Sequence, residues 1–448
     1  MMRRIFYLLT ILATCVACQN DDSFTTQKEA LLSFDVDTLK MDTVFSKTAS
    51  STYTFWVHND NSDGLRLQSV RLARRNQTGF RVNVDGSYLD NSNGSQVSDL
   101  EIRGEDSLLV FVELTAAETL QLEPQKLEDR LVFTLESGAE QSVLLQAWAW
   151  DAERVGRLTV EKDTVIESAK PLVVMERIDV APGVTLTLRN TTLYFHDGAG
   201  IDVGGTLRTE HCTLRGDRLD RMFDYLPYDR VSGQWGGVRF LESSVGNVLT
   251  DTEIRNASAA IVCDSAAMDS TQVRLLMERC TVHNAEGTGI EAVNTYLILR
   301  QCQLTNTLGP CLAVYGGIAE VSRCTLAQFY PFSADRGGAI LFSNGWGGEP
   351  VPLVRLTCEE SILTGYEEDV WTGIPIDTTT VFNYSFTNSL LRSPKVETAD
   401  SIHFVGIRWE SPKDSIQGTK HFVTIDEDNL IYDFHLDSLS TAKGLGCY

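Results

Sequence analysis

The sequence is poor in basic residues. It contains 38 Lys and Arg against 61 Asp and Glu in 448 residues, which gives a formal net charge of −23. Proteins that bind nucleic acid need a Lys- and Arg-rich surface to contact phosphates, so we expect no nucleic-acid partner. The hydrophobic share of 43% is that of a globular protein and excludes a wholly disordered chain.

The common motifs of enzymes and metal sites are missing as well. The sequence has no Walker phosphate loop, no His-Glu-x-x-His and no Gly-x-Ser-x-Gly. The seven histidines have no metal-ligand spacing, and the glycine-rich calcium repeat is absent. Ca²⁺ is compatible with so acidic a chain, but no motif indicates it, and we expect no cofactor.

The longest apolar run, from Ile5 to Ala13, is too short to cross a bilayer. Two arginines precede it, and Val16-Ala17-Cys18 follows it and resembles a bacterial lipobox. This order predicts a lipoprotein signal peptide over residues 1–17 and lipidation of Cys18, which then anchors the chain to the membrane. The polar residues 18–30 are expected to form a tether.

The residues after the lipobox bear on localisation. Gln19 follows the cysteine, and the acidic pair Asp21-Asp22 resembles the surface-export signal of Bacteroidetes lipoproteins. A plain polar tether is the alternative interpretation of this pair. We expect a lipid-anchored outer-membrane protein that faces the cell exterior, and the periplasmic face stays open as the other possibility.

Residues 31–152 alternate apolar and polar positions in short runs, such as Ser51–Val57 and Ser107–Glu113. This pattern predicts the strands of an antiparallel β-sandwich. The segments Leu32–Leu39 and Gln146–Ala152 resemble the immunoglobulin-like domain that opens many Bacteroidetes lipoproteins. The resemblance implies a spacer or docking module, and the usual Cys…Trp…Cys pattern is absent.

Residues 155–448 carry an internal repeat. Cysteines at 280, 302 and 324 recur at an interval of 22 residues, each two residues before an aliphatic side chain. Short strands with this period bury their apolar faces only by stacking, which predicts a parallel β-helix. The leucine-rich repeat signature is missing, and a globular sheet sandwich is the remaining alternative. Other copies have their small residue at Thr191, Cys212, Thr252, Ser361 and Ser389.

The repeat also predicts what its recurring polar residues do. Cys212, Cys280, Cys302 and Cys324 should face inward as free thiols, because stacked Cβ vectors run parallel and disfavour disulfides. The pattern makes no prediction for the redox state of the other four cysteines of this region. A shared turn position is expected to form an asparagine ladder from Asn256, Asn284 and Asn306.

Four segments of this region carry a resemblance to a known family, namely Val180–Phe195, Phe223–Arg230, Gly233–Phe240 and Tyr432–Leu436. They resemble the right-handed parallel β-helix lipoproteins of Bacteroidetes, a group of pectate-lyase-like solenoids without an assigned reaction. The resemblance implies that fold for residues 155–448. The wider superfamily includes pectate lyases, alginate-active enzymes and polygalacturonases.

The best candidate site is the segment 217–236, which is rich in carboxylates, arginines and aromatics. Rings can stack on a sugar while charged groups bond its hydroxyls. The candidate ligand-binding residues are Tyr225, Tyr228, Arg230 and Trp235, with Trp346 on a second loop. The candidate acid–base residues are Asp224 and Asp229, with Arg230 as base or charge neutraliser in a lyase.

The alternative interpretation is an insertion held to the surface by ion pairs, with Trp235 packed beneath it. No outward column of charged residues is expected from the repeats, which favours a binding or structural role over catalysis. The leading hypothesis is a non-catalytic β-helix that binds a glycan or a surface protein. The alternatives are a polysaccharide lyase or glycosidase that uses the same groove, and a structural cell-surface component.

Overall fold

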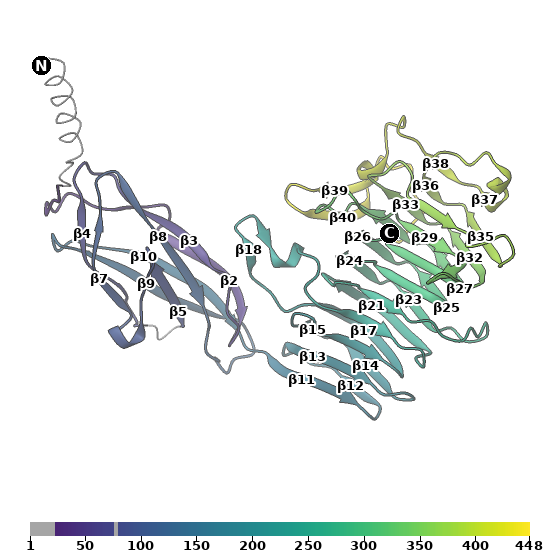
Figure 1. Cartoon of the computed structure of the whole chain (residues 1–448), viewed down its shortest axis with the longest axis horizontal. Helices are drawn as coiled ribbons and strands as arrows, with labels where there is room; N and C mark the ends of the chain where they lie inside the picture. Colours follow the sequence, from purple (N-terminus) through teal and green to yellow (C-terminus); the bar gives the residue numbers. More distant parts are fainter. Residues whose placement is uncertain (1–22, 76–78) are drawn as a thin grey trace, which may run out of the picture. The chain divides into compact units, whose positions relative to one another are not determined.

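The computed structural model describes residues 23–75 and 79–448, so the predicted signal peptide and Cys18 lie outside the described residues. The chain divides into two compact units, the first ending at Asp151 and the second comprising Ala152–Tyr448 (Figure 1). Both units are built from strands, which confirms the all-β prediction. The helical turns of the described residues are four short 3-10 segments, at Asn91–Asn93, Tyr228–Arg230 (η2), Ala399–His403 and Gly418–His421 (η4). None of the described residues forms a helix with the length and apolar character needed to cross a membrane.

The first unit consists of two five-stranded sheets, with strand orders β1-β3-β8-β5-β6 and β2-β10-β9-β4-β7. Neighbouring strands are antiparallel except for β2 and β10. The strands of the first sheet are β1 Ser33–Phe34, β3 Tyr53–Asn59, β5 Phe80–Val84, β6 Ser87–Tyr88 and β8 Asp106–Leu114. Those of the second are β2 Thr38–Phe45, β4 Leu65–Leu72, β7 Gln96–Ile102, β9 Gln125–Leu135 and β10 Glu140–Trp150.

Period-two alternation places the core of this unit between the two sheets. Phe55 and Val57 of β3 are buried, whereas Trp56 between them is 43% exposed. Phe133 of the opposite sheet belongs to the same apolar cluster. The alternating sequence pattern therefore divides each strand into a core face and a solvent face.

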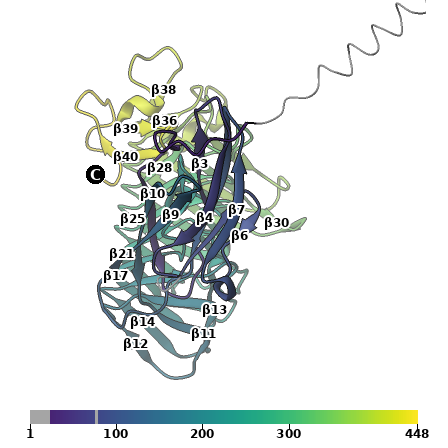
Figure 2. The same ribbon diagram turned by 90° about the vertical axis from the view of Figure 1, so that its left-hand side faces the viewer.

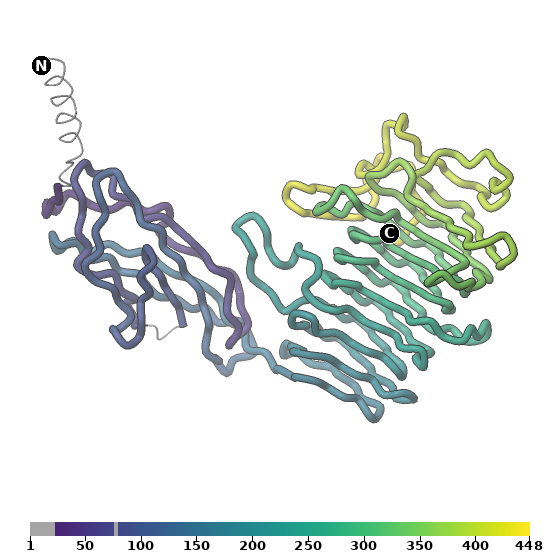
Figure 3. The backbone as a smooth tube through the Cα atoms, viewed as in Figure 1, coloured from purple at the N-terminus to yellow at the C-terminus, as the bar shows by residue number. Residues whose placement is uncertain are grey.

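The second unit is dominated by one 24-stranded sheet whose paired strands run parallel (Figure 3). Its first strands are β11 Glu153–Val160, β12 Thr164–Ile166, β13 Leu172–Val180, β14 Thr185–Arg189, β15 Thr192–Phe195, β16 Gly200–Val203, β17 Thr206–Gly216 and β20 Gly237–Phe240. The next are β21 Asn247–Arg255, β22 Ile261–Cys263, β23 Leu275–Glu278, β24 Thr281–Ala285, β25 Ile290–Arg300, β26 Gln303–Thr307, β27 Leu312–Ser322 and β28 Thr325–Gln328. The last are β29 Ile340–Ser343, β32 Leu353–Glu359, β33 Ile362–Gly365, β34 Trp371–Ile374, β35 Phe382–Thr387, β36 Leu390–Arg392, β37 Phe404–Val405 and β38 Arg408–Glu410.

Three two-stranded hairpins accompany this sheet. They are β18 Arg221–Phe223 with β19 Leu226–Pro227, β30 Gly345–Trp346 with β31 Glu349–Pro350, and β39 Phe422–Asp426 with β40 Ile431–Leu436.

Successive repeats are held in register by a row of buried aliphatic residues. Leu214 of β17 pairs with Ile254, which pairs with Val282 and then with Leu304 of β26. All four side chains are fully buried in one continuous apolar cluster. The predicted stacking of parallel strands on an aliphatic core is therefore confirmed.

The predicted cysteine column is confirmed. Cys212, Cys280, Cys302 and Cys324 are free and buried, and the Cys302 backbone N–H donates to Cys324 Sγ over 3.4 Å. The other four cysteines of the described residues are also free, at positions Cys263, Cys311, Cys358 and Cys447. Small thiols thus fill the inner face of the stack as apolar groups.

The asparagine ladder forms only in part. Asn256, Asn284 and Asn306 are buried, with φ values of 64°, 60° and 55°. Asn284 Nδ2 donates to Asn256 Oδ1 over 3.3 Å. Neither amide atom of Asn306 has a hydrogen-bond partner within the described residues. The three asparagines therefore share a turn position as predicted, and the structure adds that all three adopt the left-handed conformation, whereas the side-chain ladder does not extend to Asn306.

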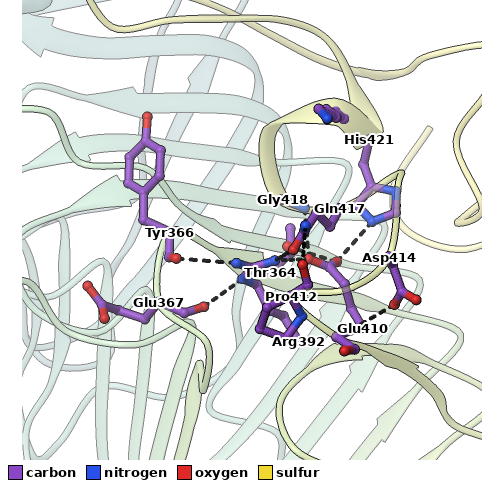
Figure 4. Close-up of polar contacts among 12 residues, drawn as sticks. Thr364, Tyr366, Glu367, Arg392, Glu410, Pro412, Asp414, Gln417, Gly418 and His421 are labelled. Atoms are coloured by element: carbon purple, nitrogen blue, oxygen red, sulfur yellow. Dashed lines mark hydrogen bonds and ion pairs between the residues drawn. The ribbon is translucent and has the colours of Figure 1, made fainter.

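A buried polar network holds the C-terminal segment to the stack (Figure 4). Glu410 Oε1 accepts hydrogen bonds from the Arg392 guanidinium and from the Gly418 N–H at 2.7 Å. His421 Nε2 lies 2.9 Å from Glu410 Oε2, and His421 Nδ1 lies 3.0 Å from Ser440 Oγ. The Ser440 hydroxyl, the His421 imidazole and the Glu410 carboxylate are arranged in the order of a hydrolase catalytic triad, but all three residues are buried. They therefore join β36 and β38 to η4 rather than face a substrate.

We expect the seven buried thiols of the described residues to react with alkylating reagents only after unfolding. Burial raises the pKa of Cys263, Cys311 and Cys358 to about 12, so these groups are protonated at pH 8. The measurement is mass-spectrometric mapping of iodoacetamide labelling at pH 8, with and without denaturant. Rapid labelling of Cys302 in the native protein would contradict the buried column.

Glu410→Gln is expected to lower the free energy of unfolding at pH 7 by about 3 kcal/mol, because it breaks a buried charge pair. Burial opposes ionisation, but hydrogen bonds from His421 and Arg392 outweigh it and lower the pKa of Glu410 from its ordinary 4.5. The ionised Glu410 therefore stabilises the folded state above pH 4.5, and this contribution is lost as the pH falls through the lowered pKa of Glu410. Urea titrations from pH 7 to pH 3 should show the difference from wild type shrinking in acid.

Glu360→Gln is the matched control for this experiment. Glu360 pairs with Arg323, but the two side chains are 41% and 58% exposed. Its loss should cost less than about 1 kcal/mol at any pH. Equal effects of the two substitutions would show that the Glu410 network contributes nothing beyond a surface ion pair.

Candidate functional site

The inner aliphatic row determines which side chains face outward on the same strands. Leu214, Ile254, Val282 and Leu304 point into the core, so the residues that follow them point out. These outward residues are Arg215, Arg255, His283 and Thr305, of which Arg255, His283 and Thr305 are register partners. The column thus begins with two charged residues on successive strands, which the sequence did not lead us to expect, and it continues with His283 and Thr305. Arg255 and His283 of this column form the floor of the candidate site.

The insertion 217–236 folds over one end of this floor. Asp229 Oδ1 lies 2.9 Å from Arg215 Nη1 and 3.1 Å from Arg255 Nη2. Asn256 Nδ2 donates to the main-chain carbonyl of Asp229 over 2.9 Å. One carboxylate thus bridges two arginines from successive strands, and it fixes the turn η2 against the floor.

The C-terminal hairpin β39–β40 covers the other end. The ring of Tyr432 lies 5.7 Å from that of His283, and Phe434 lies 6.1 Å from it. The Arg230 guanidinium of the insertion donates to the main-chain carbonyl of Asn429, which joins the two covering segments. Beyond the hairpin, the Tyr448 hydroxyl donates to Gln303 Oε1 over 2.7 Å.

A pocket of about 410 Å³ lies between the insertion and the C-terminal hairpin. Its side chains combine opposite charges with hydroxyl, imidazole and aromatic groups. The lining residues are Asp229, Arg230, Glu253, Arg255, Thr281, His283, Gln303, Leu430, Ile431, Tyr432, Phe434 and Tyr448. Such a lining suits a neutral, hydroxyl-rich ligand better than an apolar or highly charged one.

The pocket keeps two of its titratable groups neutral at physiological pH. Burial, reinforced by the charge of Arg255, lowers the pKa of His283 to about 4. Burial raises the pKa of the Tyr448 hydroxyl to about 12. The imidazole and the phenol can therefore act as uncharged hydrogen-bonding groups beside the ionised pair of Glu253 and Arg255, which lie 3.5 Å apart.

Only part of the predicted site reaches this pocket. Asp229 and Arg230 line it, whereas Tyr228 lies beside it with its ring under the Arg218 guanidinium at 4.1 Å. Tyr225 is 77% exposed at the tip of the β18–β19 hairpin. Trp346 lies in a different region, on the hairpin β30–β31.

Trp235 has no surface exposed to a ligand, contrary to the prediction. It is fully buried, and its ring stacks on Phe195 with centroids 4.3 Å apart. Its Nε1 donates to the main-chain carbonyl of Arg255 over 2.8 Å. The alternative interpretation, in which this tryptophan packs beneath the insertion, describes its position correctly.

The predicted acid–base pair is not assembled either. The Asp224 side chain is 89% exposed at the hairpin tip, 3.9 Å from Arg221, and it does not line the pocket. Asp229 instead contacts two guanidinium groups. The two carboxylates therefore do not face one another across a bound sugar.

Sequence reasoning missed Glu253, Arg255, His283 and Tyr448. The signal for two of them was present, because Arg255 and His283 occupy the same repeat position, directly after the inward aliphatic residue. Tyr448 is far from them in sequence and enters the site only through tertiary folding. Within the described residues, no group of three or more His, Cys, Asp or Glu is placed to hold a metal ion.

No protein-family model and no curated protein matches the chain. Among solved structures, the catalytic unit of a GH87 α-1,3-glucanase from Streptomyces thermodiastaticus is similar over 80% of this chain and 89% of its own, at 11% identity and a TM-score of 0.28. A Vibrio cholerae VesB protease matches 26% of this chain and 31% of its own, at 13% identity and a TM-score of 0.17. A PapD-like domain of human CEP192 matches 29% of this chain and 92% of its own, at 9% identity and a TM-score of 0.19. Similarity at this level establishes neither a common fold nor a common activity.

Asp229→Asn is expected to loosen the insertion, because Arg215 and Arg255 lose their shared carboxylate. If the charge-assisted contacts of the insertion weaken by about 1.5 kcal/mol, the population of molecules in which the insertion is locally open should rise about tenfold. Limited trypsin digestion, followed at the cleavage sites after Arg221 and Arg230, measures this opening. Asp224→Asn is the matched control and should leave the rate unchanged, and equal rates for both variants would contradict the bridging role of Asp229.

Proposed function

We propose that the protein is a surface-exposed outer-membrane lipoprotein that binds a glycan without converting it. In this proposal, lipid on Cys18 anchors the chain, and residues 18–30 form a tether. Residues 31–152 form an immunoglobulin-like spacer, and residues 155–448 form a right-handed parallel β-helix that carries the binding site.

The register of the second unit supports the β-helix. Each inner aliphatic residue pairs in parallel with its counterpart in the next repeat, from Leu193 through Leu214 to Leu391. A second ladder repeats in the same way, with Ile261 pairing to Ile290 and then to Leu312. A chain that winds in successive turns accounts for both ladders.

The pocket between the insertion and the C-terminal hairpin is the observation that carries the glycan proposal. Sugar hydroxyls donate and accept hydrogen bonds, and the pocket offers both kinds of partner in Glu253, Arg255 and the neutral His283. Tyr432 and Tyr448 add aromatic surface for the apolar face of a sugar ring. The near balance of acidic and basic side chains favours an uncharged glycan.

The contacts of the carboxylates favour binding over hydrolysis. A glycosidase needs two carboxyl groups that flank the scissile bond, one of them free to donate a proton. Arg255 instead lies between Asp229 and Glu253 and contacts both of them. A lyase or glycosidase is the second candidate, and it is supported by the presence of carboxylates and arginines in one pocket.

Glu253→Gln should weaken glycan binding about tenfold, because it removes the charge from one hydrogen-bonding partner. The measurement is a glycan-array screen of the full chain in detergent, followed by calorimetry on the strongest ligand. Asp224→Asn, which alters a carboxylate outside the pocket, should bind like wild type. Reducing-end and unsaturated-product assays accompany each ligand.

Each result has a defined meaning. Binding without product, weakened by Glu253→Gln alone, supports the proposal. Product formation overturns the non-catalytic proposal in favour of a lyase or glycosidase. Absence of binding to every glycan overturns the proposal and favours a protein partner or a structural role.

A further inference from the structure

The outer face of the second ladder carries another group of polar and aromatic residues. Glu291 of β25 pairs with Val262 of β22 and with Ala313 of β27, and Val293 pairs with Tyr315. Glu291 and Tyr315 therefore lie on the same face of adjacent strands, two positions apart in register. Asp264 follows the end of β22 directly. These residues are distinct from those that line the pocket of about 410 Å³.

The carboxyl group of Glu291 is unusual in this region. It makes no hydrogen bond and no ion pair with any described residue, although the side chain is partly buried. Burial, together with the charge of Asp264, raises the pKa of Glu291. Asp264, by contrast, accepts from Arg239 Nε with both oxygens, at 2.9 and 3.0 Å. The carboxyl oxygens of Glu291 are therefore available to accept hydrogen bonds from a ligand.

An aromatic wall stands beside this carboxyl group. The ring of Tyr315 contacts that of Trp346, with centroids 4.4 Å apart. Trp346 is 39% exposed on the hairpin β30–β31, whose strand β30 is labelled in Figure 2. Burial and, to a smaller extent, the charge of Glu291 raise the pKa of the Tyr315 hydroxyl. Trp346 was also one of the residues that the sequence indicated for ligand binding.

We infer a second carbohydrate-binding site, at which a neutral sugar ring stacks on Trp346 and Tyr315 while its hydroxyl groups bond to Glu291 and Asp264. An exposed tryptophan face suits the apolar face of a pyranose, and carboxyl oxygens accept hydrogen bonds from sugar hydroxyls. Two acidic groups face a single arginine here, so a uronic acid or a sulfated sugar would be repelled. The site extends the proposed glycan-binding function to residues that the first pocket does not use.

The test uses the full chain in detergent with the substitution Glu253→Gln, which weakens the first pocket and isolates the second site. Calorimetric titrations use cellohexaose, maltohexaose and mannohexaose as neutral probes and trigalacturonate as the acidic probe. At least one neutral probe should bind, and trigalacturonate should bind at least tenfold more weakly. Adding Trp346→Ala or Glu291→Gln should weaken the neutral ligand about tenfold.

Two controls separate a lost site from a damaged fold. Val354→Ala shortens another exposed apolar side chain of the same unit, one that is 42% exposed, and should leave binding unchanged. Trp346→Phe keeps an aromatic face and should retain binding within about threefold. Thermal unfolding of each variant should match that of the parent.

The outcomes distinguish this inference from the proposed function. Neutral binding that survives both Trp346→Ala and Glu291→Gln overturns the second site and leaves the first pocket standing. If Trp346→Ala weakens the binding of a neutral glycan and Glu253→Gln does not, the result supports the second site and counts against the first pocket. Absence of binding by any neutral probe, or equal binding of trigalacturonate, overturns the second site.

Discussion

The structure of the second unit depends on the parallel stacking of short strands over a continuous aliphatic row. A single strand of this unit cannot bury an apolar face or satisfy its backbone groups alone. When Leu214, Ile254, Val282 and Leu304 stack in register, each strand supplies hydrogen-bonding partners and apolar contacts to the next. The same register places every outward residue in a column. The register of the core residues therefore arranges the outward side chains in rows.

Ion pairs hold particular segments of the chain over these rows of outward side chains. Asp229 bridges Arg215 and Arg255 at one end of the first pocket, and the Glu410 network fixes the C-terminal segment at the other. The two networks differ in burial, because the Asp229 side chain is 45% exposed whereas Glu410 is almost fully buried. Glu410 therefore serves the stability of the fold, while Asp229 remains within reach of a ligand. The pocket lies where the insertion and the C-terminal hairpin, joined by the hydrogen bond from Arg230 to the Asn429 carbonyl, cover Arg255 and His283.

The two proposed sites use the outer faces of different ladders, and both use side chains that the repeat leaves unconstrained. In the first, Arg255 and His283 occupy the position after the inward aliphatic residue. In the second, Glu291 and Tyr315 occupy outward positions of adjacent strands. A stack of this kind tolerates any outward residue that does not disturb the inner row. It can therefore carry binding sites on more than one face without loss of core packing.

The sequence by itself determined the periodicity, and with it the strands, the inward cysteines and the shared turn position of the asparagines, because these depend on contacts repeated between neighbouring copies. It also identified the insertion 217–236 as the segment beside the site. The sequence did not show whether Trp235 is exposed or buried, because a tryptophan ring suits a ligand-binding surface as well as a core. In the structure the ring is in the core and stacks on Phe195. The sequence also did not bring Tyr448 to Gln303, across 145 residues, or separate Asp224 from Asp229. Only the tertiary structure decided these points, because they depend on how non-repeating segments fold back over the stack, and no local pattern encodes that geometry.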